Sequence, residues 1–462
     1  MIPPRLLLPA ALTLTLTLAL PLVAADHTLH TFKKLHLDEF YWSEGATFGD
    51  LNRDGLPDAI SGPYWWEAPA FTKRHEIYAP ATTFVLKQAD GTEERIPGWE
   101  GVKGKNNAYS SDNFFSFVYD FNQDGWNDVL TYGLPGTPAF LYLNPQGKAQ
   151  HWARHQVFDA VDNESPTFAD VTGDGLPEII CNSQGTFGYA SPDWKNVTAK
   201  WPFTSVSKTG EWSRFNHGLG IGDVNGDGRP DILEKGGWWE QPAAKGELWR
   251  RHPASFSPGG GAQMYTYDVN GDGWPDVISS IAAHGYGLGW YEQLKVRNDA
   301  GTPEFKAHVF MNKEPSENRY GISFSQLHAI ELVDVDGDGL KDIISGKCFW
   351  AHGPTGDPEP GAPAVLYWFR LVRGADGRVD WVPHLIDDDS GVGRQIGVAD
   401  ANGDQLPELI IGNKKGTFVF LHETRKVSAE EWTKAQPPVK FANFDDQQLK
   451  PGEVIQRTGP PR

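Results

Sequence analysis

The chain has 462 residues, with 41 Lys and Arg against 60 Asp and Glu, and a formal net charge of −19. This acidic balance argues against a nucleic-acid partner, because a phosphate-binding surface needs clustered basic residues. Only two cysteines are present, which excludes a fold held together by many disulfides.

Residues 1–25 have the pattern of a secretory signal peptide. Arg5 gives a positive start, an almost wholly apolar run follows over 6–22, and small residues close the segment at 23–25. No later stretch is apolar enough to span a bilayer. We therefore expect an exported protein, periplasmic or secreted, with no membrane span.

An acidic nine-residue motif recurs seven times between residues 50 and 408. It reads Asp-x-Asn/Asp-x-Asp-Gly-x-x-Asp/Glu, and its copies begin 45 to 70 residues apart. Runs of β-forming residues flank each copy, and a period of about four short strands is typical of propeller blades. We therefore expect an all-β fold over residues 26–427. It is a seven-bladed β-propeller of four-stranded blades, whose ring is closed by an N-terminal strand.

The motif has the chemistry of a calcium loop. Oxygen-bearing side chains at positions 1, 3, 5 and 9, with Gly at position 6, suit a hard cation. Flanking strands rather than helices exclude an EF-hand, and Thr172 and Gln405 depart from the pattern. We predict several structural Ca²⁺ ions. The predicted ligands are Asp50, Asn52, Asp54, Asp58, Asp120, Asn122, Asp124, Asp128, Asp170, Asp174, Glu178, Asp223, Asn225, Asp227, Asp231, Asp268, Asn270, Asp272, Asp276, Asp334, Asp336, Asp338, Asp342, Asp400, Asn402, Asp404 and Glu408.

The position six residues before each motif should lie at the opposite mouth of the central channel. A strand rises about 3.3 Å per residue, which separates this position from the acidic loop by roughly 20 Å. The residues at this position are Glu44, Phe114, Glu164, His217, Ala262, His328 and Arg394. The next strand of each blade returns to the same mouth, where the following loops contribute His284 and His352.

The histidines fall into two groups. One group recurs at an outer-strand position in blade after blade, which indicates packing: His36, His75, His155, His252, His308 and His384. In contrast, His217, His284 and His328 break the repeat and come from consecutive blades. Three imidazoles with an open fourth position describe a catalytic zinc site. The alternative is a hydrated polar channel lining without metal.

A zinc ion at this mouth would polarise a substrate carbonyl and acidify the adjacent C–H bond. Glu164 is the first candidate for the base that removes this proton, and Glu44 is the second. Glu164 also has the chemistry of a fourth metal ligand. Arg394 is a candidate to hold a substrate hydroxyl or carboxylate, and Tyr286 to donate a proton to the leaving hydroxyl.

Three further features do not follow the repeated pattern. Trp99 and Tyr109, in the 80–112 insertion, are candidates for stacking on a sugar. Cys181 and Cys348 fall on different blades, and we expect two buried thiols without a bridge. Residues 428–462, rich in Pro near the end, are expected to form a mobile C-terminal extension.

The chain resembles the FG-GAP or VCBS repeat family of calcium-loop β-propellers over residues 30–422. It also resembles the propeller domain of the fungal aldos-2-ulose dehydratases, whose propeller-bound zinc is implicated in dehydrating anhydrofructose-type sugars. The segments that carry this second resemblance are 163–166, 217–220, 260–264, 283–285 and 325–328. The chain is too short for the cupin and lectin-like domains that follow in those enzymes, so we expect any reaction of those domains to be absent.

Three functions follow as hypotheses. The first is an exported zinc-dependent dehydratase or lyase that acts on a keto-sugar of the 1,5-anhydrofructose or aldos-2-ulose type by β-elimination. The second is a non-catalytic calcium-stabilised propeller that binds glycans or a protein partner, since one fold hosts many functions. The third is a polysaccharide lyase that uses Glu, Arg and Tyr without zinc. A tightly held transition metal would separate the first from the other two.

Overall fold

The computed structural model describes residues 27–81, 83–87, 90–97, 113–210, 212, 214–244, 246–298, 301–374 and 378–441. The predicted signal peptide and the stacking candidates Trp99 and Tyr109 lie outside the described residues. The chain divides into a large unit, His30–Glu423 with Pro437–Arg462, and a small unit, Met1–Leu29 with Thr424–Gln436.

Four-stranded sheets form the large unit, as expected for the blades of an all-β propeller. Five of them are separate sheets. In hydrogen-bonding order they are β2(Thr47–Gly49)–β3(Asp58–Ser61)–β4(Tyr64–Trp66)–β5(Arg74–Glu76), β11(Ala153–Val161)–β10(Thr137–Leu143)–β9(Asp128–Tyr132)–β8(Phe115–Tyr119), β12(Thr167–Ala169)–β13(Glu178–Ser183)–β14(Thr186–Ala190)–β15(Phe203–Ser205), β24(Ile330–Val333)–β25(Asp342–Gly346)–β26(Leu366–Arg373)–β27(Val379–Asp387), and β1(His27–Asp38)–β30(Gly416–Val427)–β29(Glu408–Asn413)–β28(Ile396–Ala399).

The remaining large sheet has eight strands. Its order is β19(Arg250–Pro253)–β18(Gly237–Glu240)–β17(Asp231–Glu234)–β16(Leu219–Gly222)–β20(Gln263–Tyr267)–β21(Asp276–Ser280)–β22(Leu288–Arg297)–β23(Pro303–Met311). The expected count of seven separate blades is therefore wrong, because β16 and β20 pair in parallel and merge two four-stranded units. Gly220 permits this approach, since a Cβ there would collide with the carbonyl oxygen of Met264. Two short elements lie outside the blades, the hairpin β6(Thr83–Lys87)–β7(Glu93–Pro97) and the 3₁₀ helix η2(Pro315–Glu317).

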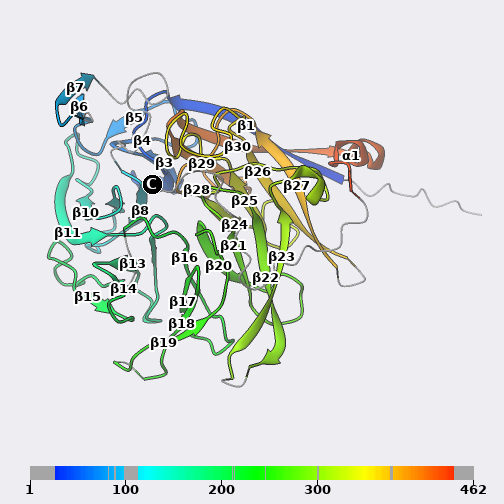
Figure 1. The fold of residues 1–462 in the computed structure, drawn as a ribbon. Helices are drawn as coiled ribbons and strands as arrows, with labels where there is room; N and C mark the ends of the chain where they lie inside the picture. Colours follow the sequence, from blue (N-terminus) through cyan, green and yellow to red (C-terminus); the bar gives the residue numbers. More distant parts are fainter. Residues whose placement is uncertain are drawn as a thin grey trace, which may run out of the picture. The chain divides into compact units, whose positions relative to one another are not determined.

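Within the large unit, the sheets follow one another in chain order around a common centre (Figure 1). The first strands of consecutive units contact each other, as in β2 with β8 and in the series β16, β20, β24 and β28. Strand β28 in turn contacts β2. Between β8 and β12 the contact is aromatic, with the ring centroids of Phe117 and Phe168 5.8 Å apart. This arrangement brings the segments that precede these strands toward one centre.

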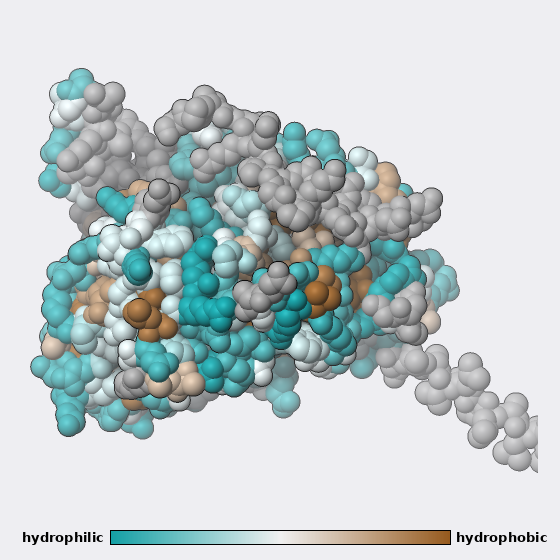
Figure 2. All heavy atoms as spheres, turned by 60° about the horizontal axis from the view of Figure 1, so that its bottom comes forward, coloured by the Kyte–Doolittle hydropathy of each residue, from teal (hydrophilic) through white to brown (hydrophobic). Residues whose placement is uncertain are grey.

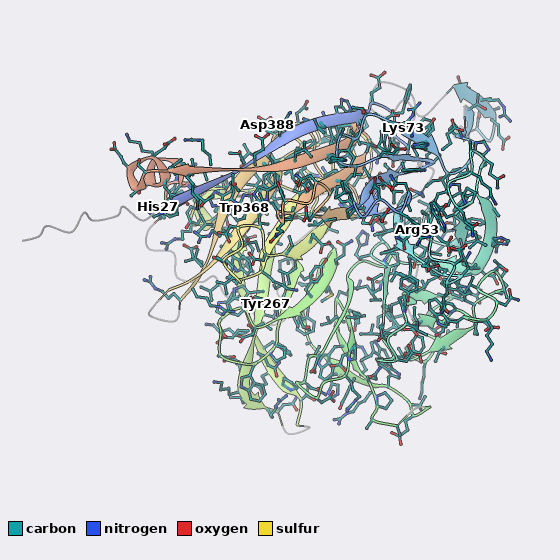
Figure 3. All side chains as sticks on the ribbon, turned by 180° about the vertical axis from the view of Figure 1, so that it is seen from behind. His27, Arg53, Lys73, Tyr267, Trp368 and Asp388 are labelled. Atoms are coloured by element: carbon teal, nitrogen blue, oxygen red, sulfur yellow. The ribbon has the colours of Figure 1, made fainter. Side chains whose placement is uncertain are left out.

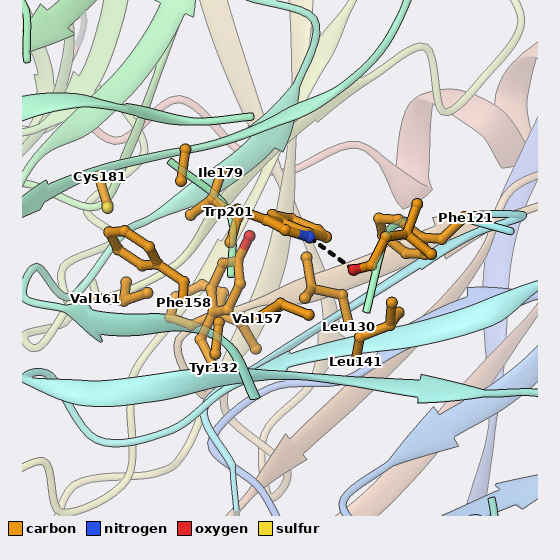
Figure 4. Packing of buried hydrophobic residues seen from close by; sticks show 14 of the residues in the cluster. Phe121, Leu130, Tyr132, Leu141, Val157, Phe158, Val161, Ile179, Cys181 and Trp201 are labelled. Carbon is orange, nitrogen blue, oxygen red and sulfur yellow. Dashed lines mark hydrogen bonds between the residues drawn. The ribbon is translucent and has the colours of Figure 1, made fainter. Parts of the chain in front are cut away.

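Apolar side chains fill the space between neighbouring sheets. In the cluster between the β8–β11 and β12–β15 sheets, Phe121, Leu130 and Tyr132 are fully buried (Figure 4). Trp201 joins this cluster and donates its indole N–H to the Val197 carbonyl at 2.8 Å. Successive side chains of a strand point to opposite faces of its sheet, so each sheet can pack against the neighbouring sheet on either side.

The outer-strand histidines pack as predicted, each against the neighbouring strand. His75, His252, His308 and His384 stack on Trp65, Trp238, Trp290 and Trp368, with ring centroids 4.1, 4.2, 4.3 and 4.5 Å apart. Trp368 is labelled in Figure 3. His36 stacks on Phe418, and His155 pairs with Leu141 across β10 and β11. The repeat of these histidines is therefore a packing feature.

The small unit contains helix α1(Ala429–Ala435). Ser428 caps it by accepting a hydrogen bond from the Glu431 N–H at 3.2 Å, and the His27 ring stacks on Trp432 at 4.9 Å. The predicted C-terminal extension thus begins with a capped helix rather than with irregular chain. Residues 442–462 of that extension lie outside the described residues.

The face drawn in Figure 2 is mostly hydrophilic, with hydrophobic residues in small separate groups. Scattered apolar residues of this kind are normal for a protein surface. Among the described residues, no helix combines the length and the apolar character that a membrane span requires.

Candidate metal centre

The segments just before β2, β12, β16, β24 and β28 hold the predicted channel-mouth residues. Isolated parallel bridges join such segments side by side, as in Ser43 with Asn113 and Asn163 with Asn216. Glu164 and His328 are 3% and 2% exposed, and Arg394 and Glu44 are fully buried. The six-residue offset from the acidic motif therefore selects one buried level of the propeller.

Four of the predicted residues come together in this level. One ligand atom each from Glu164, His217, His284 and His328 lies within 4.8 Å of the other three. The ring centroid of His284 lies 4.8 Å from that of His217 and 4.4 Å from that of His328. His284 reaches the group from the loop between β21 and β22, whereas the other three precede inner strands. We call these four residues the Glu–His₃ cluster.

Hydrogen bonds outside the cluster set the tautomers of two of its imidazoles. The Nδ1 of His328 lies 3.3 Å from the Gln326 carbonyl, and the Nδ1 of His284 lies 3.2 Å from Asp357 Oδ1. Both partners only accept, so each Nδ1 carries the proton and each Nε2 keeps its lone pair. His328 Nε2 is buried and has no hydrogen-bond partner among the described residues. A buried nitrogen lone pair without a donor is the group that a divalent cation would satisfy.

The charged groups in and around the cluster also set protonation states that suit a metal ion. Burial by itself would raise the pKa of Glu164, but His217 and Arg394 lower it well below its usual value. Burial lowers the pKa of His284 to about 4 and that of His328 well below its ordinary value, to which Arg394 adds. Around neutral pH the cluster therefore offers a carboxylate and at least two neutral imidazoles, the protonation states that bind zinc.

Glu44, the second candidate base, is held in a separate buried ion pair. Its Oε1 contacts the Lys414 ammonium and accepts a hydrogen bond from the Tyr41 hydroxyl. Burial is the largest single influence and would raise the pKa of Glu44, but Lys414, Arg394 and the Tyr41 hydroxyl together lower it below its usual value. This pairing favours a structural role for Glu44 over a role as a base.

Arg394 and Tyr286 have partners within the protein. The Nε of Arg394 donates to Glu164 Oε2 at 3.1 Å, and its Nη1 lies 2.9 Å from Cys348 Sγ. Tyr286 is 7% exposed and interacts with the side chains of Glu359 and Ser325. Burial and Glu359 raise the pKa of Tyr286, so its hydroxyl keeps the proton. The structure thus places Arg394 against the cluster and Tyr286 on a neighbouring hydrogen-bond network.

The seven acidic loops share one hydrogen-bond pattern. The position-1 carboxylate accepts the backbone N–H of position 6, as Asp50 does from Gly55 at 3.0 Å. Gln405 takes the place of this glycine in the last loop, with φ of 70°, and its N–H makes the same bond to Asp400. The position-9 carboxylate accepts the N–H of position 2 at 2.8 to 3.2 Å in every loop. The departures at Thr172 and Gln405 therefore leave the loop geometry intact.

Carboxylates gather closely in the last two loops. Ligand oxygens lie within 4.8 Å of one another in the groups Asp334, Asp336, Asp342 and Asp400, Asp404, Glu408. Burial raises the pKa of Asp342 to about 8, and that of Glu408 to about 7. In the sixth loop the Arg370 guanidinium lies 2.6 Å from Asp336 and 3.3 Å from Asp338. A cation in this loop would therefore compete with Arg370.

Comparison with known proteins gives a family for one part of the chain. Residues 120–181 match the FG-GAP-like repeat model. This segment is an FG-GAP-like repeat. It runs from the second acidic loop through the third and includes Glu164 of the Glu–His₃ cluster. No curated protein matches the chain significantly, and the resemblance to the fungal aldos-2-ulose dehydratases stays a prediction.

Solved β-propellers resemble the chain at low identity. An Agrocybe aegerita lectin, described as recognising non-reducing terminal N-acetylglucosamine, is 15% identical, with a TM-score of 0.41 over 86% of this chain and 97% of the lectin. Rhamnogalacturonan lyase YesW is 16% identical, with a TM-score of 0.38, and the match covers 85% of this chain and 72% of the lyase. An auxiliary nutrient-binding protein from Bacteroides ovatus is 9% identical, with a TM-score of 0.38, and the match covers 73% of this chain and 82% of that protein. Similarities of this size carry no further conclusion for this chain.

Several residues around the cluster escaped the sequence analysis. Lys347 and Lys414 are fully buried, and each directly follows the second strand of its four-stranded unit, β25 and β29. Burial lowers the pKa of Lys347 to about 8. Asp357 bonds to His284 from the insertion that follows Lys347. Lysines at the end of apolar strands were a usable signal, whereas nothing in the motif pattern points to Asp357.

Proposed function

We propose that this chain is an exported, metal-dependent carbon–oxygen lyase that dehydrates a keto-sugar of the 1,5-anhydrofructose or aldos-2-ulose type. The observation that supports it is the Glu–His₃ cluster, whose ligand atoms lie within 4.8 Å and whose His328 Nε2 lacks a donor. Three imidazoles with an open fourth position are a donor set that suits catalytic zinc, and Glu164 lies beside them.

The proposed reaction is a β-elimination. When bound, the zinc would polarise the substrate carbonyl as a Lewis acid. The three imidazoles of His217, His284 and His328 would hold the metal. Glu164, kept ionised by the Arg394 guanidinium that bonds to it, takes the proton from the carbon next to the carbonyl. Tyr286 gives its phenolic proton to the leaving hydroxyl, which departs as water. Release of the abstracted proton from Glu164 to solvent and uptake of a proton by Tyr286 restore both groups.

Three further features complete the proposal. The acidic loops bind Ca²⁺ as structural ions, which would offset the buried carboxylates at position 9. Strand β1, which lies beside β30 in the last sheet, closes the ring of the propeller. A signal peptide over residues 1–25 directs the protein to a periplasm or to the medium.

Elemental analysis of the EDTA-washed mature protein is the first test. About one zinc per chain, lost in His328→Ala, would support the cluster as a metal site. Dehydration of 1,5-anhydrofructose, followed by the ultraviolet absorbance of the unsaturated ketone, should then require both zinc and His328. Full activity in metal-stripped protein and in His328→Ala would refute the mechanism.

Calcium without a transition metal would favour the second candidate, a non-catalytic propeller that binds glycans or a protein partner. Near-complete burial of Glu164 and His328 is the observation on its side, because a substrate must reach these atoms. Glycan-array binding that is unchanged in His328→Ala would support this candidate.

A further inference from the structure

The insertion between β25 and β26 is built onto the residues that precede His328. The Pro358 carbonyl accepts hydrogen bonds from Ser325 Oγ at 2.9 Å and from Gln326 Nε2 at 3.2 Å. The Ala351 N–H donates to Gln326 Oε1 at 3.1 Å. These bonds fix the insertion beside the Glu–His₃ cluster, because Gln326 is also the residue whose carbonyl orients His328.

Asp357, at the centre of this insertion, connects two histidines. Its side chain is 5% exposed, and Oδ1 lies 3.2 Å from His284 Nδ1 and 2.9 Å from His352 Nδ1. Its Oδ2 accepts the His352 backbone N–H at 2.8 Å. The two imidazole rings stack with centroids 4.3 Å apart. A buried carboxylate thus has both oxygens engaged on the outer side of one cluster ligand.

The turn that presents Asp357 leaves no room for a side chain at the preceding residue. A Cβ on Gly356 would collide with the His352 carbonyl oxygen and with its Cβ. The close turn from His352 to Asp357 therefore depends on glycine, and any larger residue would force this turn to shift.

We propose that Asp357 is a positioning residue that fixes the Nδ1–H tautomer and the ring orientation of His284, so that His284 Nε2 faces the metal. Such a carboxylate makes the imidazole a stronger ligand and limits its rotation. The inference rests on the proposed function, because it assigns Asp357 to the same metal site. His352, 37% exposed at its side chain, serves only as the second anchor of Asp357.

Metal binding by three variants tests this assignment. Asp357→Asn keeps the shape but removes the charge, and we expect zinc affinity, measured by chelator competition, to fall by about 10- to 100-fold. His352→Ala leaves the bond between Asp357 and His284 and should change affinity by less than about threefold. Asp380→Asn, on β27, is the matched control, because Asp380 bonds to Tyr320 at 2.7 Å and pairs with Arg319.

Cobalt distinguishes a changed site from a loss of fold, because unfolding abolishes the absorption bands whereas a reoriented ligand shifts them. The visible absorption of Co²⁺-loaded protein should change in intensity and position in Asp357→Asn and stay the same in Asp380→Asn. In the metal-free wild type, the ¹⁵N shifts of His284 should show the Nδ1–H tautomer, a measurement that needs no Asp357 variant to fold.

The outcomes separate this inference from the proposed function. Wild-type protein that binds no transition metal overturns both. A metal-binding wild type with unchanged affinity and cobalt spectrum in Asp357→Asn overturns the inference alone, as does an Nε2–H tautomer of His284. The inference is supported if Asp357→Asn lowers zinc affinity, Asp357→Glu partly restores it, and Asp380→Asn leaves it unchanged.

Discussion

Replacement of Lys414 by Met should expose how strongly the buried ion pair with Glu44 stabilises the propeller. Both side chains are fully buried, and Glu44 Oε1 contacts the ammonium and the Tyr41 hydroxyl. Glu44 Oε2 has no hydrogen-bond partner among the described residues. Lys414→Met therefore leaves a carboxylate in the interior without its main counter-charge.

The expected cost is about 3–5 kcal/mol of unfolding free energy at pH 7, the range for removing one partner of a buried ion pair. The double variant Glu44→Gln with Lys414→Met removes the charge as well. It should recover at least about 2 kcal/mol of that loss, because neither charge of the pair is then left buried without its partner.

The pH dependence of the stability difference between Lys414→Met and the wild type is a second, independent test. In the wild type the folded protein lowers the pKa of Glu44 below its value in the unfolded chain. Ionised Glu44 therefore stabilises the fold at pH values above the unfolded-state pKa, and this stabilisation is lost as pH falls through the folded-state pKa. In Lys414→Met, burial raises this pKa instead, and the deficit should shrink as pH falls from 7 to 5 and the carboxyl gains a proton. Each unit of pKa difference corresponds to about 1.4 kcal/mol.

Urea unfolding followed by tryptophan fluorescence at both pH values, on the wild type and the two variants, measures these differences. A cost below about 1 kcal/mol for Lys414→Met would refute the reasoning. A double variant that is less stable than the single one would refute it as well.

Three further predictions concern the repeats. His308→Ala removes the stack on Trp290 and the 2.7 Å bond to Glu292 and should cost about 1–3 kcal/mol in urea unfolding, with zinc content unchanged. Because burial raises the pKa of Asp276 to about 7, stability of the calcium-free protein should fall as pH rises from 5 to 8, and added Ca²⁺ should flatten this slope in thermal scans. Gly220→Ala should destabilise by about 1–3 kcal/mol because its Cβ meets Met264 in the parallel pairing of β16 with β20, whereas Gly361→Ala, with open space around it, should be neutral.

The amino-acid sequence was sufficient for the repeat, the four-stranded units and the residues that gather at the centre. Periodicity carries this information, because a fixed offset from each acidic motif selects the same level in every blade. That is why Glu164, His217 and His328 could be named together, and why the histidines stacked on tryptophan could be assigned to packing.

Contacts between distant segments were decided only by the tertiary structure. The pairing of Lys414 with Glu44 joins residues 370 positions apart, and Asp357 reaches His284 across 73 positions. The merging of two blades depends on the spacing of β16 and β20, which no local pattern specifies. Local propensity and repeat period determine which strands form, whereas close packing of particular side chains determines which charges meet in the interior.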